Sequence, residues 1–224
     1  MACVGIVGGL GVGATVHYYE TISRICKARG VVPDLVFVHA DVGRGQGLVR
    51  GGKLAELAEY LAGFVERLER AGAVAAALPA VTPHICIREL TPLLAIPLIN
   101  IVETLATELI ARKIKRVALM GSIFTVQGAL WGQLAGVEIV RPQPEEIAFI
   151  GAAYQRILDD KTEAGDAGGL RHIARELQRR DGVEAILLAG TDLAVIFDEA
   201  TAGFPCIDMA RLHIDAIVER LCAQ

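Results

Sequence analysis

Two short segments of the chain each join an acid–base side chain to a neighbouring hydroxyl, directly after a run typical of a buried strand. His84 follows Thr82 in the first segment, and Asp192 follows Thr191 in the second. A helix N-terminus disfavours a charged imidazole, so His84 is a candidate neutral base; a ring held by a backbone carbonyl is the alternative. Burial would raise the pKa of Asp192 and make it a usable acid or base, and its carboxylate could also bind an ammonium group.

The two threonines are candidate ligand contacts. The hydroxyls and backbone amides of Thr82 and Thr191 suit the carboxylate or ammonium group of a small substrate. Threonine also caps helix N-termini, so capping is the alternative for both, and one role does not exclude the other.

A glycine-rich loop, Gly8–Gly13, follows the first predicted strand. Its backbone N–H groups and the helix N-terminus after it could face an anion such as a carboxylate. A tight strand-to-helix turn explains the same glycines. The spacing of Gly9, Gly11 and Ala14 also fits a dinucleotide fingerprint with Asp41 as a ribose ligand, which makes a dehydrogenase-like nucleotide binder a third class of function.

Short β-branched runs alternate with longer stretches whose apolar residues recur at helical spacing. Leu54–Ala71 is a clear helix, and Val74–Leu78 is continuous and apolar, as buried parallel strands are. This alternation predicts an α/β fold with a parallel sheet. The other predicted elements of the first half are strands at Cys3–Val7, Leu35–Ala40 and Pro97–Ile101 and helices at Ala14–Ala28 and Ile85–Leu94.

The pattern then starts again. Val4–Gly8 is similar to Val117–Gly121, the segment around Ala80 to that around Gly190, and Ile96–Ile99 to Phe204–Ile207. The same order at similar offsets indicates two related halves. Ligands of open α/β sheets bind outside the carboxyl ends of the strands. Two facing halves would therefore place Ala80 and Gly190 across one cleft.

Composition excludes several classes of function. The chain has 224 residues, 53% of them apolar and 21% charged, and a net charge of −4 with scattered basic residues, so we expect neither a nucleic-acid partner nor a membrane surface. The N-terminus has no basic signal region, so a cytoplasmic protein is expected. The five cysteines and five histidines show no metal-ligand spacing, which predicts buried reduced thiols and no metal.

Motifs along most of the chain resemble the aspartate/glutamate racemase superfamily. Residues 78–84 and 188–193 resemble its two catalytic corners, P-C-N-T-x-H and G-C-T-E-L. The opening Gly8-Gly9-Leu10-Gly11 with Ala14-Thr15, the segment Gly121–Thr125, and Asp208, Arg211 and His213 resemble its G-G-M-G-x-x-A-T, G-T-x-x-T and D-T-T-R-x-H motifs.

The resemblance implies two pseudo-symmetric, three-layer α/β domains with four-stranded parallel sheets and the active-site cleft between them. The first would comprise residues 1–99 and the returning helix in 208–224, and the second residues 100–207. It also implies a homodimer that uses no pyridoxal phosphate, no other cofactor and no metal. Typical substrates of the family are small acidic amino acids.

The family's two cysteine positions hold Ala80 and Gly190 in this chain. Racemisation removes a Cα proton and returns one to the opposite face, which requires an acid–base group on each side of the carbon. A thiol, with an ordinary pKa of roughly 8.5, can be tuned for this work. A methyl group or a hydrogen atom cannot. We therefore expect two-thiol racemisation to be weak or absent.

The resemblance carries further ligand contacts. Ser122 and Thr125 would contact an anion, with helix capping as the alternative. Arginine in the family's corresponding loop binds the distal carboxylate, which points to Arg44 or Arg50 in the predicted mobile loop Gly43–Gly52. Lys161 would face the cleft, or else lie on a helix surface.

Three explanations stay open for the missing thiols. The chain is a diverged isomerase or lyase that uses His84 or Asp192, a catalytically silent protein that binds a small carboxylate or amino acid, or a variant with substitutions introduced to trap substrate. Differences such as Val81 and Asp192 in place of the family's Asn and Glu favour natural divergence.

Overall fold

The computed structural model describes residues 2–223, and the chain divides into two compact units. Unit 1 comprises the residues up to Ile101 together with those from Arg211 onward, and unit 2 comprises Val102–Ala210. Each unit is an α/β structure built around its own four-stranded parallel sheet, as the alternating pattern of the sequence predicts.

The sheet of unit 1 has the strand order β2-β1-β3-β4, and all of its pairs are parallel. Parallel strands covered on both faces read as continuous apolar runs, and every residue of β1 and β3 is buried. The strands are β1 (Val4–Gly8), β2 (Leu35–His39), β3 (Ala75–Ala77) and β4 (Leu98–Ile99).

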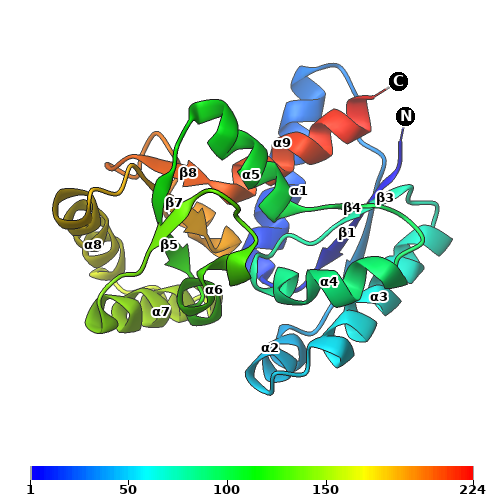
Figure 1. Ribbon diagram of the computed structural model, residues 1–224. Helices are drawn as coiled ribbons and strands as arrows, with labels where there is room; N and C mark the ends of the chain where they lie inside the picture. The colour runs from blue at the N-terminus through cyan, green and yellow to red at the C-terminus, as the bar shows by residue number, and fades with distance from the viewer. Residues whose placement is uncertain (1, 224) are drawn as a thin grey trace. The chain divides into compact units, whose positions relative to one another are not determined.

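Helices connect these strands. The chain moves from β1 to β2 in one direction and from β2 to β3 in the other, so right-handed crossovers place α1 and α3 on opposite faces of the sheet. Figure 1 shows α9 beside α1. The helices are α1 (Val12–Ala28), α2 (Val42–Arg50), α3 (Leu54–Arg70), α4 (Ile87–Leu90) and α9 (Met209–Cys222), with 3-10 turns η1 (Thr82–Cys86) and η2 (Thr91–Leu93).

A glycine lets α3 pack close to the sheet. A Cβ atom on Gly5 of β1 would lie 2.7 Å from Leu68 Cβ of α3, closer than real Cβ contacts come. Leu57, Leu61, Val65 and Leu68 form the buried stripe of this helix at helical spacing.

Two segments of unit 1 differ from the sequence prediction. The expected loop Gly43–Gly52 is largely helix α2, because Asp41 caps it by accepting hydrogen bonds from Gly43 N (2.8 Å) and Arg44 N (3.2 Å). The expected helix Ile85–Leu94 is instead three short turns. Pro92 lacks the N–H group that a continuous helix would use.

Unit 2 repeats the strand order of unit 1, with β6-β5-β7-β8 all parallel. Its strands are β5 (Arg116–Gly121), β6 (Glu138–Val140), β7 (Ala185–Ala189) and β8 (Cys206–Asp208). Its helices are α5 (Ile101–Arg112), α6 (Ile123–Gly128), α7 (Pro144–Leu158) and α8 (Asp166–Asp181), with 3-10 turns η3 (Ala129–Gly132) and η4 (Thr191–Val195). Among residues 2–223, the chain forms no helix with the length and apolar character needed to cross a bilayer.

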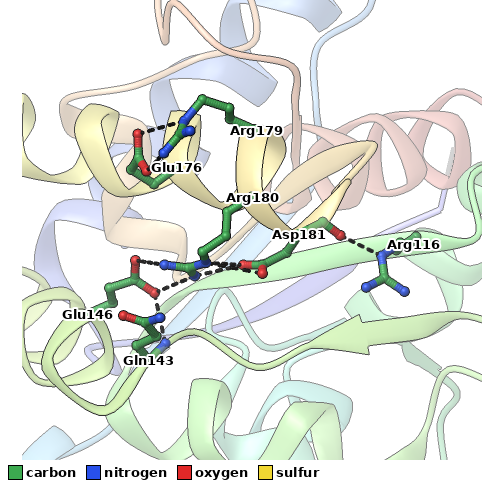
Figure 2. A network of polar contacts seen from close by, with 7 residues as sticks. All are labelled: Arg116, Gln143, Glu146, Glu176, Arg179, Arg180 and Asp181. Atoms are coloured by element: carbon green, nitrogen blue, oxygen red, sulfur yellow. Dashed lines mark hydrogen bonds and ion pairs between the residues drawn. The ribbon is translucent and has the colours of Figure 1, made fainter.

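A polar network joins the start of α7 to the end of α8 (Figure 2). The Arg180 guanidinium binds both oxygens of Glu146, at 2.9 and 3.1 Å, and also contacts Asp181. Glu146 in turn accepts a hydrogen bond from Gln143 N at 2.8 Å, which caps α7. Arg116 Nε donates to the Asp181 carbonyl at 2.8 Å, so the same network reaches β5.

Two buried histidines lie in unit 1. His213 Nε2 donates to the Ile99 carbonyl at 2.7 Å, which leaves Nδ1 to accept from the Tyr18 hydroxyl at 3.0 Å and so joins α9 to α1. Burial lowers the pKa of His213 to about 3 and that of His84 to about 4. Both rings are therefore neutral in the folded protein at neutral pH.

We predict that unit 1 loses stability as the pH falls from 7 to 5. Below the unfolded pKa of about 6.5, the unfolded chain binds a proton at each histidine that the folded chain does not, so acid favours unfolding. Each ring should remove about 2 kcal/mol of unfolding free energy over this range. Urea unfolding of the whole chain at both pH values measures the change. His213→Gln should flatten the dependence, and exposed His172→Gln should not; equal urea midpoints at pH 7 and pH 5 would contradict the assignment.

We also predict that Arg180→Ala lowers the thermal midpoint of the protein and that Arg179→Ala does not. Arg180 joins two helices through a bidentate ion pair, whereas Arg179 forms its ion pair with Glu176 on its own helix and is largely exposed. An exposed pair within one helix contributes little. Differential scanning calorimetry measures the thermal midpoints of the two variants. Equal midpoints would show that the ion pair between Arg180 and Glu146 does not stabilise unit 2.

Candidate functional sites at the strand ends

Neighbouring strands of unit 1 bring two predicted segments to one edge of the sheet. β1 and β3 pair in parallel, with Ile6 opposite Ala77, so the glycine loop after β1 and the Ala80 segment after β3 leave the sheet at the same edge. This is the edge at which open α/β sheets bind ligands.

Thr15 holds the glycine loop as a tight turn. Gly9 N donates to Thr15 Oγ1 at 3.1 Å, and that hydroxyl donates to the Gly11 carbonyl at 2.7 Å. Gly9 has a φ of +79°, and a Cβ atom there would lie 2.8 Å from His39 Nε2 and closer still to the Ala40 carbonyl. The turn thus explains why Gly9 is glycine, and Gly11 stands at the N-cap of α1.

The first corner is held by a histidine. His84 Nδ1 donates to the Ala80 carbonyl at 3.0 Å, the arrangement that the sequence left open as the alternative to catalysis. His84 is fully buried, Ala80 is 7% exposed, and Thr82 is half-buried at the start of η1. Val81 occupies the N-cap, so Thr82 does not cap this turn. The corner presents a methyl group and a hydroxyl, and its imidazole is a weak base because burial lowers its pKa to about 4.

The predicted basic contacts lie on surfaces of their own units. Arg44 and Arg50 are exposed on α2, and the Arg44 guanidinium lies 4.6 Å from the centre of the Tyr60 ring. Lys161 is exposed in the segment that follows α7. Arg44 and Arg50 therefore lie on a capped helix and not in the mobile loop that the sequence predicts.

In unit 2, Ser122 follows β5 and caps α6. Its Oγ accepts from Thr125 N at 3.2 Å and lies 3.0 Å from Thr125 Oγ1. Ser122 is half-buried and Thr125 is fully buried. The capping role is therefore present, and the Ser122 hydroxyl lies at the carboxyl edge of β5.

The second corner follows β7, the neighbour of β5. A Cβ atom on Gly121 would lie 3.0 Å from Gly190 N, so the two strand ends are in contact. Gly190 is the N-cap of η4, and Thr191 and Asp192 begin that turn with exposures of 1% and 3%. Thr191 therefore does not supply the cap.

Sequence reasoning did not identify Tyr154 as part of this corner. The Tyr154 hydroxyl, from α7, donates to Asp192 Oδ2 at 3.1 Å. Burial and the nearby Asp192 carboxylate raise the pKa of Tyr154 well above its ordinary value, so the phenol stays protonated. Gly190 stands where the family has a cysteine, and a glycine at such a position indicates that another group approaches closely. Nothing in the sequence tells which residue that is.

Cys86 lies two residues after His84, and its thiol ionises poorly. Burial raises the pKa of the Cys86 thiol to about 12, and its Sγ donates to the Pro83 carbonyl at 3.2 Å. Within residues 2–223, no group of three or more His, Cys, Asp or Glu side chains is arranged to hold a metal ion.

Solved structures share this fold along the whole chain. A proposed Asp/Glu racemase from Yersinia pestis is 21% identical, with both chains fully covered and a TM-score of 0.85. An aspartate racemase homologue from Pyrococcus horikoshii is 22% identical, again with full coverage of both and a TM-score of 0.81. Glutamate racemase from Thermus thermophilus, solved with beta-chloro-D-alanine, is 21% identical over 98% of this chain and 80% of its own, with a TM-score of 0.65.

A family model covers nearly the whole chain as well. The model of the Asp/Glu/hydantoin racemases matches residues 7–217, which include both strand-end corners and the first part of the returning helix α9. The chain belongs to the Asp/Glu/hydantoin racemase family.

Proposed function

We propose that the protein binds a small carboxylic or amino acid at the carboxyl ends of its strands and performs little or no two-thiol racemisation. The observation that carries the proposal is the chemistry of Ala80 and Gly190, which hold no ionisable group at the two corners of a racemase-family chain. Without an acid–base group on each face of Cα, a bound amino acid keeps its configuration.

The polar groups at the strand ends favour a carboxylate. Thr82 and Ser122 place hydroxyls at the carboxyl edges of their sheets, beside backbone N–H groups of short turns. Hydroxyls and backbone amides are suitable donors to a carboxylate, and they need no metal or cofactor. Arg44 or Arg50 would supply the cation for a distal carboxylate. A cytoplasmic homodimer stays a prediction from the family resemblance.

An enzyme that relies on His84 is less well supported than a binding protein. The His84 ring donates through Nδ1 to the Ala80 carbonyl and has a pKa of about 4, which makes it a poor base for a weakly acidic Cα proton. Asp192 is the stronger candidate for an isomerase or lyase, because its carboxylate lies at the corner itself.

We predict that a small dicarboxylate or acidic amino acid raises the thermal midpoint of the protein. A ligand at 100 times its dissociation constant should stabilise the folded state by about 2.7 kcal/mol. Differential scanning fluorimetry with aspartate, glutamate and malate measures the shift. Thr82→Val should reduce the shift, while Thr107→Val, which changes an exposed hydroxyl on α5, should preserve it. No shift with any of these acids would count against the proposed ligand class.

We predict no loss of the α-proton signal when the protein is incubated with L-aspartate or L-glutamate in deuterated water. Proton NMR over hours measures the exchange, and any two-base racemase of the family would serve as the positive control. Exchange at a rate abolished by Asp192→Asn would instead establish this carboxylate as an acid–base group and would overturn the binding proposal.

A further inference from the structure

The space that a side chain at residue 190 would need is already filled. A Cβ atom built on Gly190 would lie 2.8 Å from Cζ and 2.9 Å from Cδ2 of the Tyr154 ring, and Cε2 lies closer still. Real Cβ atoms essentially never come within 3.0 Å of a heavy atom outside their own residue and its chain neighbours. The backbone at Gly190 is extended, with φ −141° and ψ 112°, a conformation that any residue adopts. The ring alone therefore accounts for the glycine.

The ring has little freedom to move aside. Tyr154 is 8% exposed and belongs to α7, whose neighbouring positions Ile150, Ala153 and Ile157 are also buried. Its hydroxyl donates to Asp192 Oδ2 at 3.1 Å, and Asp192 is only 3% exposed. A rotated ring would break this hydrogen bond. The buried Asp192 carboxylate would then lose the phenol as a donor, which would destabilise the folded state.

We propose that Tyr154 determines what the second corner can hold: its ring excludes every side chain from position 190, and its hydroxyl with the Asp192 carboxylate replaces a thiol as the group that meets a ligand there. The first half of this proposal rests on geometry within unit 2. The second half rests on the proposed function, because it assumes that a ligand reaches this corner.

The replacement changes the chemistry of the corner. A thiol can act as acid or base near neutral pH once its pKa is lowered. The Tyr154 phenol keeps its proton, because burial and the Asp192 carboxylate raise its pKa. Its one O–H proton is donated to Asp192 Oδ2, so the phenol oxygen can only accept a hydrogen bond from a ligand, such as one from an ammonium group, and it cannot remove a Cα proton. The side chain of a cysteine introduced at residue 190 would clash with the Tyr154 ring and could not reach a substrate in the arrangement seen here.

A double-mutant cycle tests the steric half. Gly190→Ala should lower the thermal midpoint by about 4–10 °C, because it overpacks a buried site. In a Tyr154→Ala background the same substitution should lower the midpoint by no more than about 1 °C. Gly168→Ala is the matched control, since a Cβ atom on Gly168 of α8 has no neighbour within 4 Å, and it should not lower the midpoint in either background.

Two further variants complete the test. One separates the effect of the ring from that of its hydroxyl, and the other replaces Tyr154→Ala if that variant does not fold. Tyr154→Phe keeps the ring, so Gly190→Ala should cost as much in that background as in the natural one. Tyr154→Val serves if Tyr154→Ala does not fold, because a valine lacks every ring atom near position 190. An equal cost of Gly190→Ala in the natural, Tyr154→Phe and valine backgrounds would overturn the steric proposal.

Hydrogen exchange tests the functional half. Ala80→Cys with Gly190→Cys should give no α-proton exchange with aspartate or glutamate, and adding Tyr154→Ala should give measurable exchange. Measurable exchange that is equal with and without Tyr154→Ala would overturn the role of Tyr154. No exchange in any variant, together with a coupled stability cycle, would overturn the proposed ligand site and leave the steric role supported.

Discussion

Both units depend on glycines at positions where two parts of the chain approach so closely that a Cβ atom would not fit. In unit 1, α3 reaches β1 because Gly5 leaves room for Leu68, and the loop after β1 can turn because Gly9 adopts a positive φ beside the Ala40 carbonyl. In unit 2, the ends of β5 and β7 touch at Gly121, and a tyrosine ring fills the space at Gly190. Protein interiors are packed densely enough that one added methyl group must displace a neighbour. The glycines therefore fix how closely strands, helices and corners meet.

The corners combine this tight packing with buried polar groups that are held in one protonation state. His84 donates to the Ala80 carbonyl and stays neutral, and Tyr154 keeps its proton beside Asp192. Groups fixed in this way orient their neighbours, such as the Ala80 carbonyl and the Asp192 carboxylate, but exchange protons poorly near neutral pH. Acid–base catalysis requires pKa values near the working pH, and burial moves the pKa values of His84 and Tyr154 away from it.

Periodicity and strand-end motifs were enough to predict the fold. The apolar runs at Val4–Gly8 and Ala75–Ala77 and the amphipathic stripe of α3 are local signals that predict a parallel sheet. The repeat of the pattern and the family resemblance predicted the second sheet. Helix α2 could not be predicted, because its glycines oppose helix formation and only the Asp41 cap and burial of Gly45 and Val49 favour it. Tyr154 was missed for another reason: its contact with Gly190 spans 36 positions of sequence, and spacing carries no information about such a pair.

The placement of α9 has a consequence for how the chain is made. Helix α9 is translated after all the strands of both sheets, yet from Arg211 onward it belongs to unit 1, where His213 accepts the hydrogen bond of Tyr18. Unit 2 is one continuous stretch, Val102–Ala210, and is fully synthesised before the part of α9 that belongs to unit 1. During synthesis the uninterrupted unit can finish folding first, while the unit that begins the chain waits with Tyr18 uncovered for its last helix. The order of completion is thus the reverse of the order in which the two units begin.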